Sequence, residues 1–130
     1  MSCNVSLPTN VTEPERLAHE RLDAYRVAIE FLALAHPLCA RLPRTKGQLG
    51  DQMARAAESI VLRIAEGAGC EWRSADQKRH FRAARGSVLE CSAALDICRI
   101  RRIGSPEQLS TGRSLLVRLT QMLTRLCRGS

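Results

Sequence analysis

Apolar residues recur along this chain at alternating steps of three and four, the spacing of one face of an α-helix. The pattern predicts four helices, over residues 14–41, 46–68, 75–103 and 106–127. The third has the longest stripe: Phe81, Ala84, Val88, Cys91, Leu95 and Cys98. The second has Leu49, Met53, Ala56, Ile60, Ile64 and Gly67, and the fourth has Leu109, Leu116, Leu119, Leu123 and Leu126. The first offers Leu22, Tyr25, Ile29, Leu32 and Cys39.

Polar residues mark where these helices begin and end. Each segment starts with Ser or Thr followed three positions later by Glu or Gln, the pattern of a capping box. The four pairs are Thr12/Glu15, Thr45/Gln48, Ser74/Gln77 and Ser105/Gln108. The predicted stops are Leu42-Pro43, Gly67 with Gly69, and Gly104. Pro37 lies inside the first helix, where it predicts a kink or a break.

Long helices joined by short links favour antiparallel neighbours, so we predict an all-α fold, an up-down-up-down four-helix bundle. The chain has 130 residues, enough for one hydrophobic core. Residues 1–13 are expected to be a polar N-terminal tail and residues 14–128 the bundle. Because aromatic residues make up only 3% of the chain, the core must consist of aliphatic residues and cysteine.

The cysteines and the N-terminal sequence together indicate a cytoplasmic protein. Residues 1–15 lack the basic start and apolar stretch of a signal peptide, and no uninterrupted apolar run reaches membrane-spanning length. The six cysteines form no CxxC pair and fall mostly within apolar helical patterns. We therefore expect them to act as small buried hydrophobes rather than as disulfides or metal ligands, and no cofactor is predicted.

Positive charge is concentrated in the second half of the chain. The formal net charge is +7, with a balance of −1 over residues 1–72 and +8 over residues 73–130. Such asymmetry is typical of a surface that faces a polyanion, although an ordinary solvated surface is the alternative. Arginine suits phosphate because its planar group donates two parallel hydrogen bonds. The candidate nucleic-acid-binding residues are Lys78, Arg79, Arg82, Arg85, Arg99, Arg101, Arg102, Arg118 and Arg125.

The second and third predicted helices each have a further ordered face in addition to the apolar stripe that faces the core. Gln52, Arg55, Ser59, Arg63 and Glu66 form a polar flank beside the apolar stripe of the second helix, where Arg63 and Glu66 are spaced to pair. The third helix has a second face of Ala83, Ser87, Glu90, Ala94 and Ile97, and Gly86 weakens it without a local gain. A helix that is apolar on two sides predicts contact with another chain, most simply self-association.

The run RAAESIVLRIAEGAG (residues 55–69), followed by ARGSVLE (residues 84–90), resembles a bacterial four-helix-bundle family. That family includes the proteins encoded in 23S ribosomal RNA intervening sequences and the accessory variability determinant proteins of diversity-generating retroelements. The resemblance covers about residues 20–127. It implies an antiparallel four-helix bundle and, in the retroelement branch, a pentameric barrel whose basic surface contacts nucleic acid and the reverse transcriptase.

Most positions of these two runs match the family pattern, and two positions depart from it. Arg63 stands where the family commonly has Asn, and Cys70 stands where Arg often follows the glycines. Residues 56, 60, 64 and 65 match as well. Combined with the second face of the third helix, the matches give these candidates for an oligomer interface or structural motif: Arg55, Ser59, Arg63, Glu66, Gly67, Ala83, Gly86, Ser87, Glu90 and Ala94.

Catalysis has little support in the sequence. None of His19, His36 and His80 has a Glu three residues before it, so a di-metal helical-bundle enzyme is not indicated. We therefore expect no catalytic residue and no metal site. The favoured function is a non-enzymatic homo-oligomer that binds RNA or DNA, accessory to a reverse transcriptase or to ribosomal RNA. The main alternative is a protein-interaction or scaffold module, and a weaker one is metal or redox sensing through the cysteines.

Overall fold

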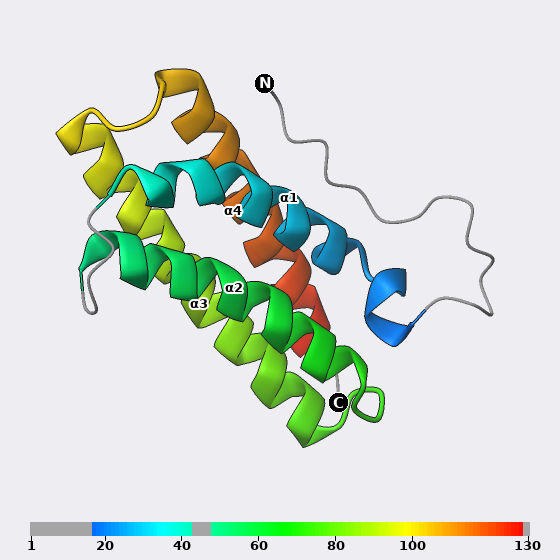
Figure 1. The fold of residues 1–130 in the computed structure, drawn as a ribbon. Helices are drawn as coiled ribbons and strands as arrows, with labels where there is room; N and C mark the ends of the chain where they lie inside the picture. The colour runs from blue at the N-terminus through cyan, green and yellow to red at the C-terminus, as the bar shows by residue number, and fades with distance from the viewer. Residues whose placement is uncertain (1–16, 43–47, 129–130) are drawn as a thin grey trace.

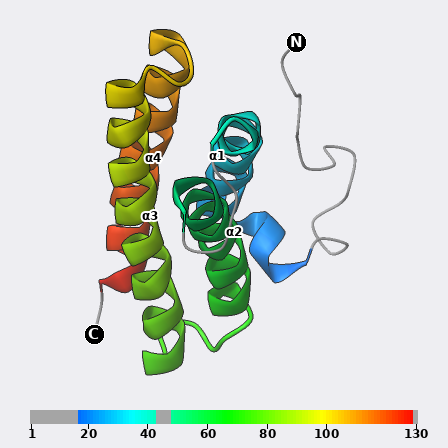
Figure 2. The same cartoon turned by 60° about the vertical axis from the view of Figure 1, so that its left-hand side comes forward.

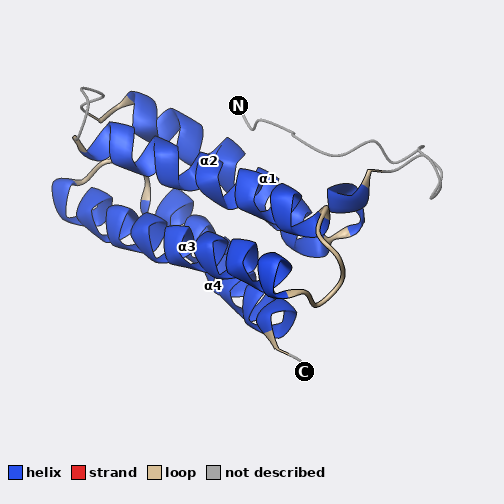
Figure 3. Ribbon diagram, turned by 90° about the horizontal axis from the view of Figure 1, so that it is seen from below, coloured by secondary structure: helices blue, strands red, loops and turns tan. Residues whose placement is uncertain are grey.

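The computed structural model describes residues 17–42 and 48–128, and within these ranges the chain forms helices and no strand (Figure 3). A short 3₁₀ helix, η2 (Ala18–Arg21), precedes four α-helices. These are α1 (Asp23–Ala40), α2 (Leu49–Ala68), α3 (Ala75–Arg101) and α4 (Pro106–Cys127), as Figure 1 shows. The predicted all-α class is confirmed, and the C-terminal ends of all four predicted helices lie within two residues of the observed ends.

Each long helix packs against two others. α2 contacts α1 and α3, and α4 also contacts α1 and α3. The result is two layers, one of α1 and α2 and one of α3 and α4 (Figure 2). Short links over residues 69–74 and 102–105 connect α2 to α3 and α3 to α4. Within the described ranges, none of the helices combines the length and the apolar character needed to cross a lipid bilayer.

Two of the four predicted helix starts are confirmed by their hydrogen bonds. The Ser74 hydroxyl accepts a bond from the Gln77 backbone N–H at 3.1 Å, and Ser105 accepts from Gln108 at 3.0 Å. Gln108 also accepts from the Ser105 N–H, which completes a capping box. These bonds satisfy N–H groups that have no partner inside the helix. Both helices accordingly begin where the sequence predicts.

The other starts differ from the prediction. Gln48 is extended and acts as the N-cap of α2, so the helix begins at residue 49 rather than 46. The predicted first helix is interrupted at Leu22, which is extended between η2 and α1. α1 continues through Pro37 to Ala40, so the predicted break is absent; only three residues follow the proline, and little of the helix depends on its missing N–H. Thr12, Glu15 and Thr45 lie outside the described residues.

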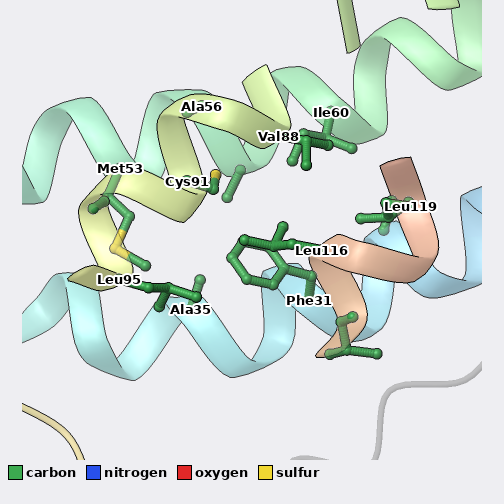
Figure 4. Packing of buried hydrophobic residues seen from close by; sticks show 14 of the residues in the cluster. Phe31, Ala35, Met53, Ala56, Ile60, Val88, Cys91, Leu95, Leu116 and Leu119 are labelled. Carbon is green, nitrogen blue, oxygen red and sulfur yellow. The ribbon is translucent and has the colours of Figure 1, made fainter. Parts of the chain in front are cut away.

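The core lies between the two layers and receives side chains from all four helices (Figure 4). All six members of the predicted α3 stripe are buried. Phe31 and Phe81 are the largest side chains with no exposed surface. Gly112 on α4 lies beneath Phe31, since a Cβ at residue 112 would stand 3.6 Å from the ring. Two aromatic rings and many aliphatic side chains thus fill the core, as the composition predicts.

The predicted core face of α1 is correct only in part, because most of its members lie at the edge of the core rather than inside it. Of its five predicted members, Cys39 is buried, whereas Leu22, Tyr25, Ile29 and Leu32 are only half-buried. The observed face comprises Ala24, Val27, Ala28, Phe31, Ala35 and Leu38. α1 is apolar around most of its circumference, and spacing alone therefore does not select which side faces the core.

Gly67 allows the end of α2 to approach the start of α3. A Cβ at residue 67 would lie 2.6 Å from Cε1 of Phe81 and 3.2 Å from Cβ of His80. Phe81 is fully buried and has no room to withdraw. We expect Gly67→Ala to lower the free energy of unfolding by roughly 1–2 kcal/mol, because overpacking costs more than the gain in helix propensity.

Gly86 provides the matched control for this prediction, measured by urea denaturation. A Cβ at residue 86 would meet nothing within 4 Å. Gly86→Ala is therefore expected to raise the free energy of unfolding by about 0.5–1 kcal/mol. Equal effects at the two glycines would contradict the packing that the structure assigns to Gly67.

Candidate nucleic-acid interface

The first half of α3 carries the densest group of predicted binding residues. Arg79 and Arg82 are exposed, and Lys78 and Arg85 are half-buried. Arg85 lies on the side of α3 that faces α4, because its Nη1 donates to the Thr124 hydroxyl at 3.4 Å. This bond joins the start of α3 to the end of α4. We call Lys78, Arg82 and Arg85 the α3 basic surface.

Two of the predicted arginines are partly neutralised by acids on their own helix. Arg79 Nη2 lies 2.7 Å from Oδ1 of Asp76, and Arg99 Nη2 lies 3.7 Å from Oδ1 of Asp96. The hydrogen bond and charge of Arg79 hold the pKa of Asp76 below its ordinary 3.8. Both pairs are exposed, and water screens their attraction. Arg82 has no such pair among the described residues, which makes it the freest cation of this half of α3.

A second basic cluster lies where α3 meets the start of α4. Arg99 and Arg102 line a groove of about 630 Å³ there, and Arg113 of α4 joins them. Leu95, Pro106 and Leu109 supply its apolar lining. The backbone of Arg102 has the left-handed helical conformation, with φ 57°. Arg102 is the C-cap of α3, and the chain turns there toward α4. Sequence reasoning missed Arg113, because its proximity to Arg99 depends on how α3 and α4 are aligned.

The remaining predicted cations are separated from these clusters. Arg125 shares a small hollow with Arg21, Leu22 and Asp23, and so faces the start of α1. Arg118 is exposed and lies two turns earlier on the same face of α4. Arg101 is exposed near the end of α3. The structure therefore distributes the nine predicted residues over at least two sides of the molecule.

The polar flank of α2 packs against α3 rather than pairing within itself. The Ser59 and Ser87 hydroxyls lie 3.1 Å apart, and Arg63 Nη1 lies 3.1 Å from Nδ1 of His80. The predicted pair between Arg63 and Glu66 is absent from the described residues. Arg55 pairs instead with Asp51 at 3.1 Å. The contacts of Ser59 and Arg63 thus give part of the polar flank of α2 a structural role at the α2–α3 interface.

Two of the five members of the predicted second face of α3 are covered within the chain itself, whereas Glu90 and Ile97 are exposed. Ser87 and Ala94 are buried, and Gly67 is buried against Phe81 and His80, so none of the three is available to a partner. The reason is that α3 packs against both α2 and α4, which buries a wider arc than one stripe. Gly86 and Glu90 are exposed, and Ala83 is half-buried.

A different row of α3 residues faces solvent. Leu89 is 65% exposed and Ile100 is 74% exposed, and Ile97 is exposed as well. With Gly86 and Ala93, these residues recur at steps of three and four along one side of the helix. We call this row the α3 apolar stripe. It lies beyond the basic first half of the same helix.

Three cysteines are buried as the sequence predicts. Cys39, Cys91 and Cys98 belong to the core, and none of the three is in a disulfide. Burial raises the pKa of Cys91 to about 12, and it also raises the pKa of Cys98. Thiols in that state are poor nucleophiles. Cys70 and Cys127 are half-buried, and Cys3 lies outside the described residues.

Comparison with known protein families agrees with this architecture. The family model for the 23S rRNA-intervening sequence protein matches residues 20–125, which include the second half of η2 and all four α-helices except the last two residues of α4. No curated protein matches the chain. The match covers both basic clusters and the α3 apolar stripe.

Proposed function

Because the chain belongs to the 23S rRNA-intervening sequence protein family, we propose that it is a non-enzymatic, homo-oligomeric, antiparallel four-helix bundle that binds RNA or DNA. It acts in the cytoplasm as an accessory to ribosomal RNA or to a reverse transcriptase. The observation that carries the proposal is the surplus of cations on the α3–α4 side. Residues 73–130 hold 12 Lys and Arg against 4 Asp and Glu. Two of those acids are already paired with Arg79 and Arg99.

The chemistry of this surface favours contact with the phosphate backbone. Arg82 and Arg85 present guanidinium groups that fit phosphate oxygens. The chain has few aromatic side chains, and its single tryptophan, Trp72, lies in the α2–α3 link. Stacking of bases on aromatic rings therefore contributes little. We expect binding with weak sequence preference and steep dependence on salt.

The α3 apolar stripe supports the oligomeric part of the proposal. An exposed helix face that includes Leu89 and Ile100 is costly to leave in water, and the small side chain of Ala93 between them allows a neighbouring helix to approach closely. The α3 basic surface precedes the stripe along the helix, whereas Arg99 and Arg101 lie at the same end of α3 as Ile97 and Ile100. Self-association through the stripe would thus leave the α3 basic surface accessible and bring several copies of it together.

Placing charge on this stripe is expected to separate the subunits. Leu89→Glu with Ile100→Glu should convert the oligomer to monomer, because burying two carboxylates in an apolar contact costs several kcal/mol. Both side chains are exposed in the single chain, and the variant is expected to fold. Sedimentation velocity measures the change. A wild-type protein that sediments as a monomer at all concentrations would contradict self-association.

The alternative is a protein-interaction module, which the same exposed stripe also favours. A pull-down with the tagged full-length protein, with and without nuclease, distinguishes the two. The proposed function predicts bound nucleic acid in the untreated sample, together with any proteins that nuclease treatment releases. One protein retained in stoichiometric amount after nuclease, with no nucleic acid bound before it, would support the module instead.

A further inference from the structure

We propose that Cys70, Asp76 and His80 together bind a Zn²⁺ ion at the turn between α2 and α3. Cys70 lies in the link after α2, and Asp76 and His80 are four residues apart in the first turns of α3. One ligand atom from each residue lies within 4.8 Å of the other two. The proposed site is separate from the α3 apolar stripe, and it does not depend on the proposed function.

The spacing of these atoms is close to that of a tetrahedral zinc site. With zinc–ligand bonds of about 2.0–2.3 Å, neighbouring ligand atoms in a tetrahedron are about 3.3–3.8 Å apart. Cys70 Sγ and Asp76 Oδ2 are already 3.9 Å apart. The distance between the two most widely separated ligand atoms would have to shorten by no more than about 1.5 Å to reach this range. Rotation of the side chains can supply this change. No movement of a helix is required.

The backbone around the site is held by several hydrogen bonds. The Gln77 side chain donates to the Gly67 carbonyl at 3.0 Å and accepts from the Arg73 N–H at 2.8 Å, which ties the link to both helices. The Cys70 N–H donates to the Gly67 carbonyl at 3.1 Å. Close contact between Gly67 and His80 fixes the helix that carries two ligands. Ligands on such a rigid frame lose little entropy when they bind a metal.

The ligand types select zinc among common divalent ions. A thiolate, an imidazole and a carboxylate form a mixed S, N, O set, which suits zinc and is too soft for Mg²⁺ or Ca²⁺. The Asp76 side chain is 64% exposed, so water can occupy the fourth position. On binding, the Cys70 thiol releases its proton to solvent, and the hydrogen bond from that thiol to the Glu66 carbonyl at 3.4 Å is lost.

The positive charges of two nearby arginines oppose Zn²⁺ binding, and this repulsion provides a specific test of the proposal. Arg63 donates to Nδ1 of His80 at 3.1 Å, and its charge opposes a metal on either ring nitrogen. Arg79 occupies Oδ1 of Asp76 and leaves Oδ2 toward Cys70. Arg63→Gln should therefore tighten zinc binding, whereas a purely structural contact between Arg63 and His80 predicts no such gain.

The test uses the full-length, metal-free protein with Co²⁺ as a spectroscopic probe. One equivalent of Co²⁺ should produce a thiolate-to-cobalt charge-transfer band and the visible bands of a tetrahedral ion, and Zn²⁺ should displace both. Cys70→Ser should abolish the charge-transfer band. Asp76→Asn should weaken binding by more than roughly tenfold, since even outer-shell changes reach that size.

Cys127→Ser is the matched control, because Cys127 is the other half-buried free cysteine among the residues that the structure describes. It should leave the spectrum and the affinity unchanged. Circular dichroism of each variant excludes unfolding as the cause of a loss. The proposal is overturned if wild-type protein gives no charge-transfer band, or if the band persists in Cys70→Ser.

Discussion

Replacing Arg82 and Arg85 together by glutamate is expected to weaken binding to single-stranded RNA on the order of 100-fold near physiological salt. Each lost phosphate contact removes the free energy of counterion release, and each new carboxylate repels the backbone. Arg82 is exposed, and the hydrogen bond from Arg85 to the Thr124 hydroxyl is long, at 3.4 Å, so the fold should survive. Fluorescence anisotropy with a labelled RNA measures the affinity.

Arg118→Glu with Arg125→Glu is the control, since it changes the net charge by the same amount on another side of the molecule. Arg125 lies against the start of α1 rather than beside α3. If the α3 basic surface carries the binding, this variant should lose much less affinity. Equal losses in the two variants would mean that net charge, not the position of Arg82 and Arg85, determines binding.

Phe31→Ala is expected to lower the free energy of unfolding by about 3–5 kcal/mol, the largest effect on stability among the changes considered. Phe31 has no exposed surface and lies at the centre of the core in Figure 4. Its removal takes apolar area out of the core and leaves a cavity beside Gly112 that neighbouring helices cannot fill. Urea denaturation followed by circular dichroism measures the loss.

Phe31→Leu retains most of the buried volume and should cost less than half as much. The comparison distinguishes cavity formation from any requirement for an aromatic ring. If the free energy of unfolding of Phe31→Ala were within about 1 kcal/mol of the wild-type value, that result would contradict a core centred on this residue.

The extent to which the sequence predicts the fold depends on how polar each helix is. On α4, a serine cap and a single apolar stripe between polar faces determine both the start and the buried side, and on α3 the serine cap determines the start. On α1, alanine and other apolar residues surround the helix, and the half-buried Leu32 is indistinguishable by spacing from the buried Phe31. Periodicity selects a face only where the opposite face is polar.

The candidate interface was predictable residue by residue but not as a surface. The exposed arginines of α3 follow from charge and helical spacing, as the structure confirms for Arg82. Contacts between helices do not follow, because they depend on alignment: Arg113 beside Arg99, and Ser87 against Ser59. The same reason hides the proximity of Cys70 to His80. These residues are separated along the chain and meet only because the α2–α3 link turns back.

The salt dependence of RNA binding tests the central claim most directly. For wild-type protein the logarithm of the affinity should fall linearly with the logarithm of the salt concentration. In Arg82→Gln with Arg85→Gln, the slope should decrease in magnitude by about 1.4, which corresponds to two lost contacts with single-stranded phosphates. An unchanged slope in that variant, or wild-type binding that is insensitive to salt, would contradict a phosphate-binding surface on α3.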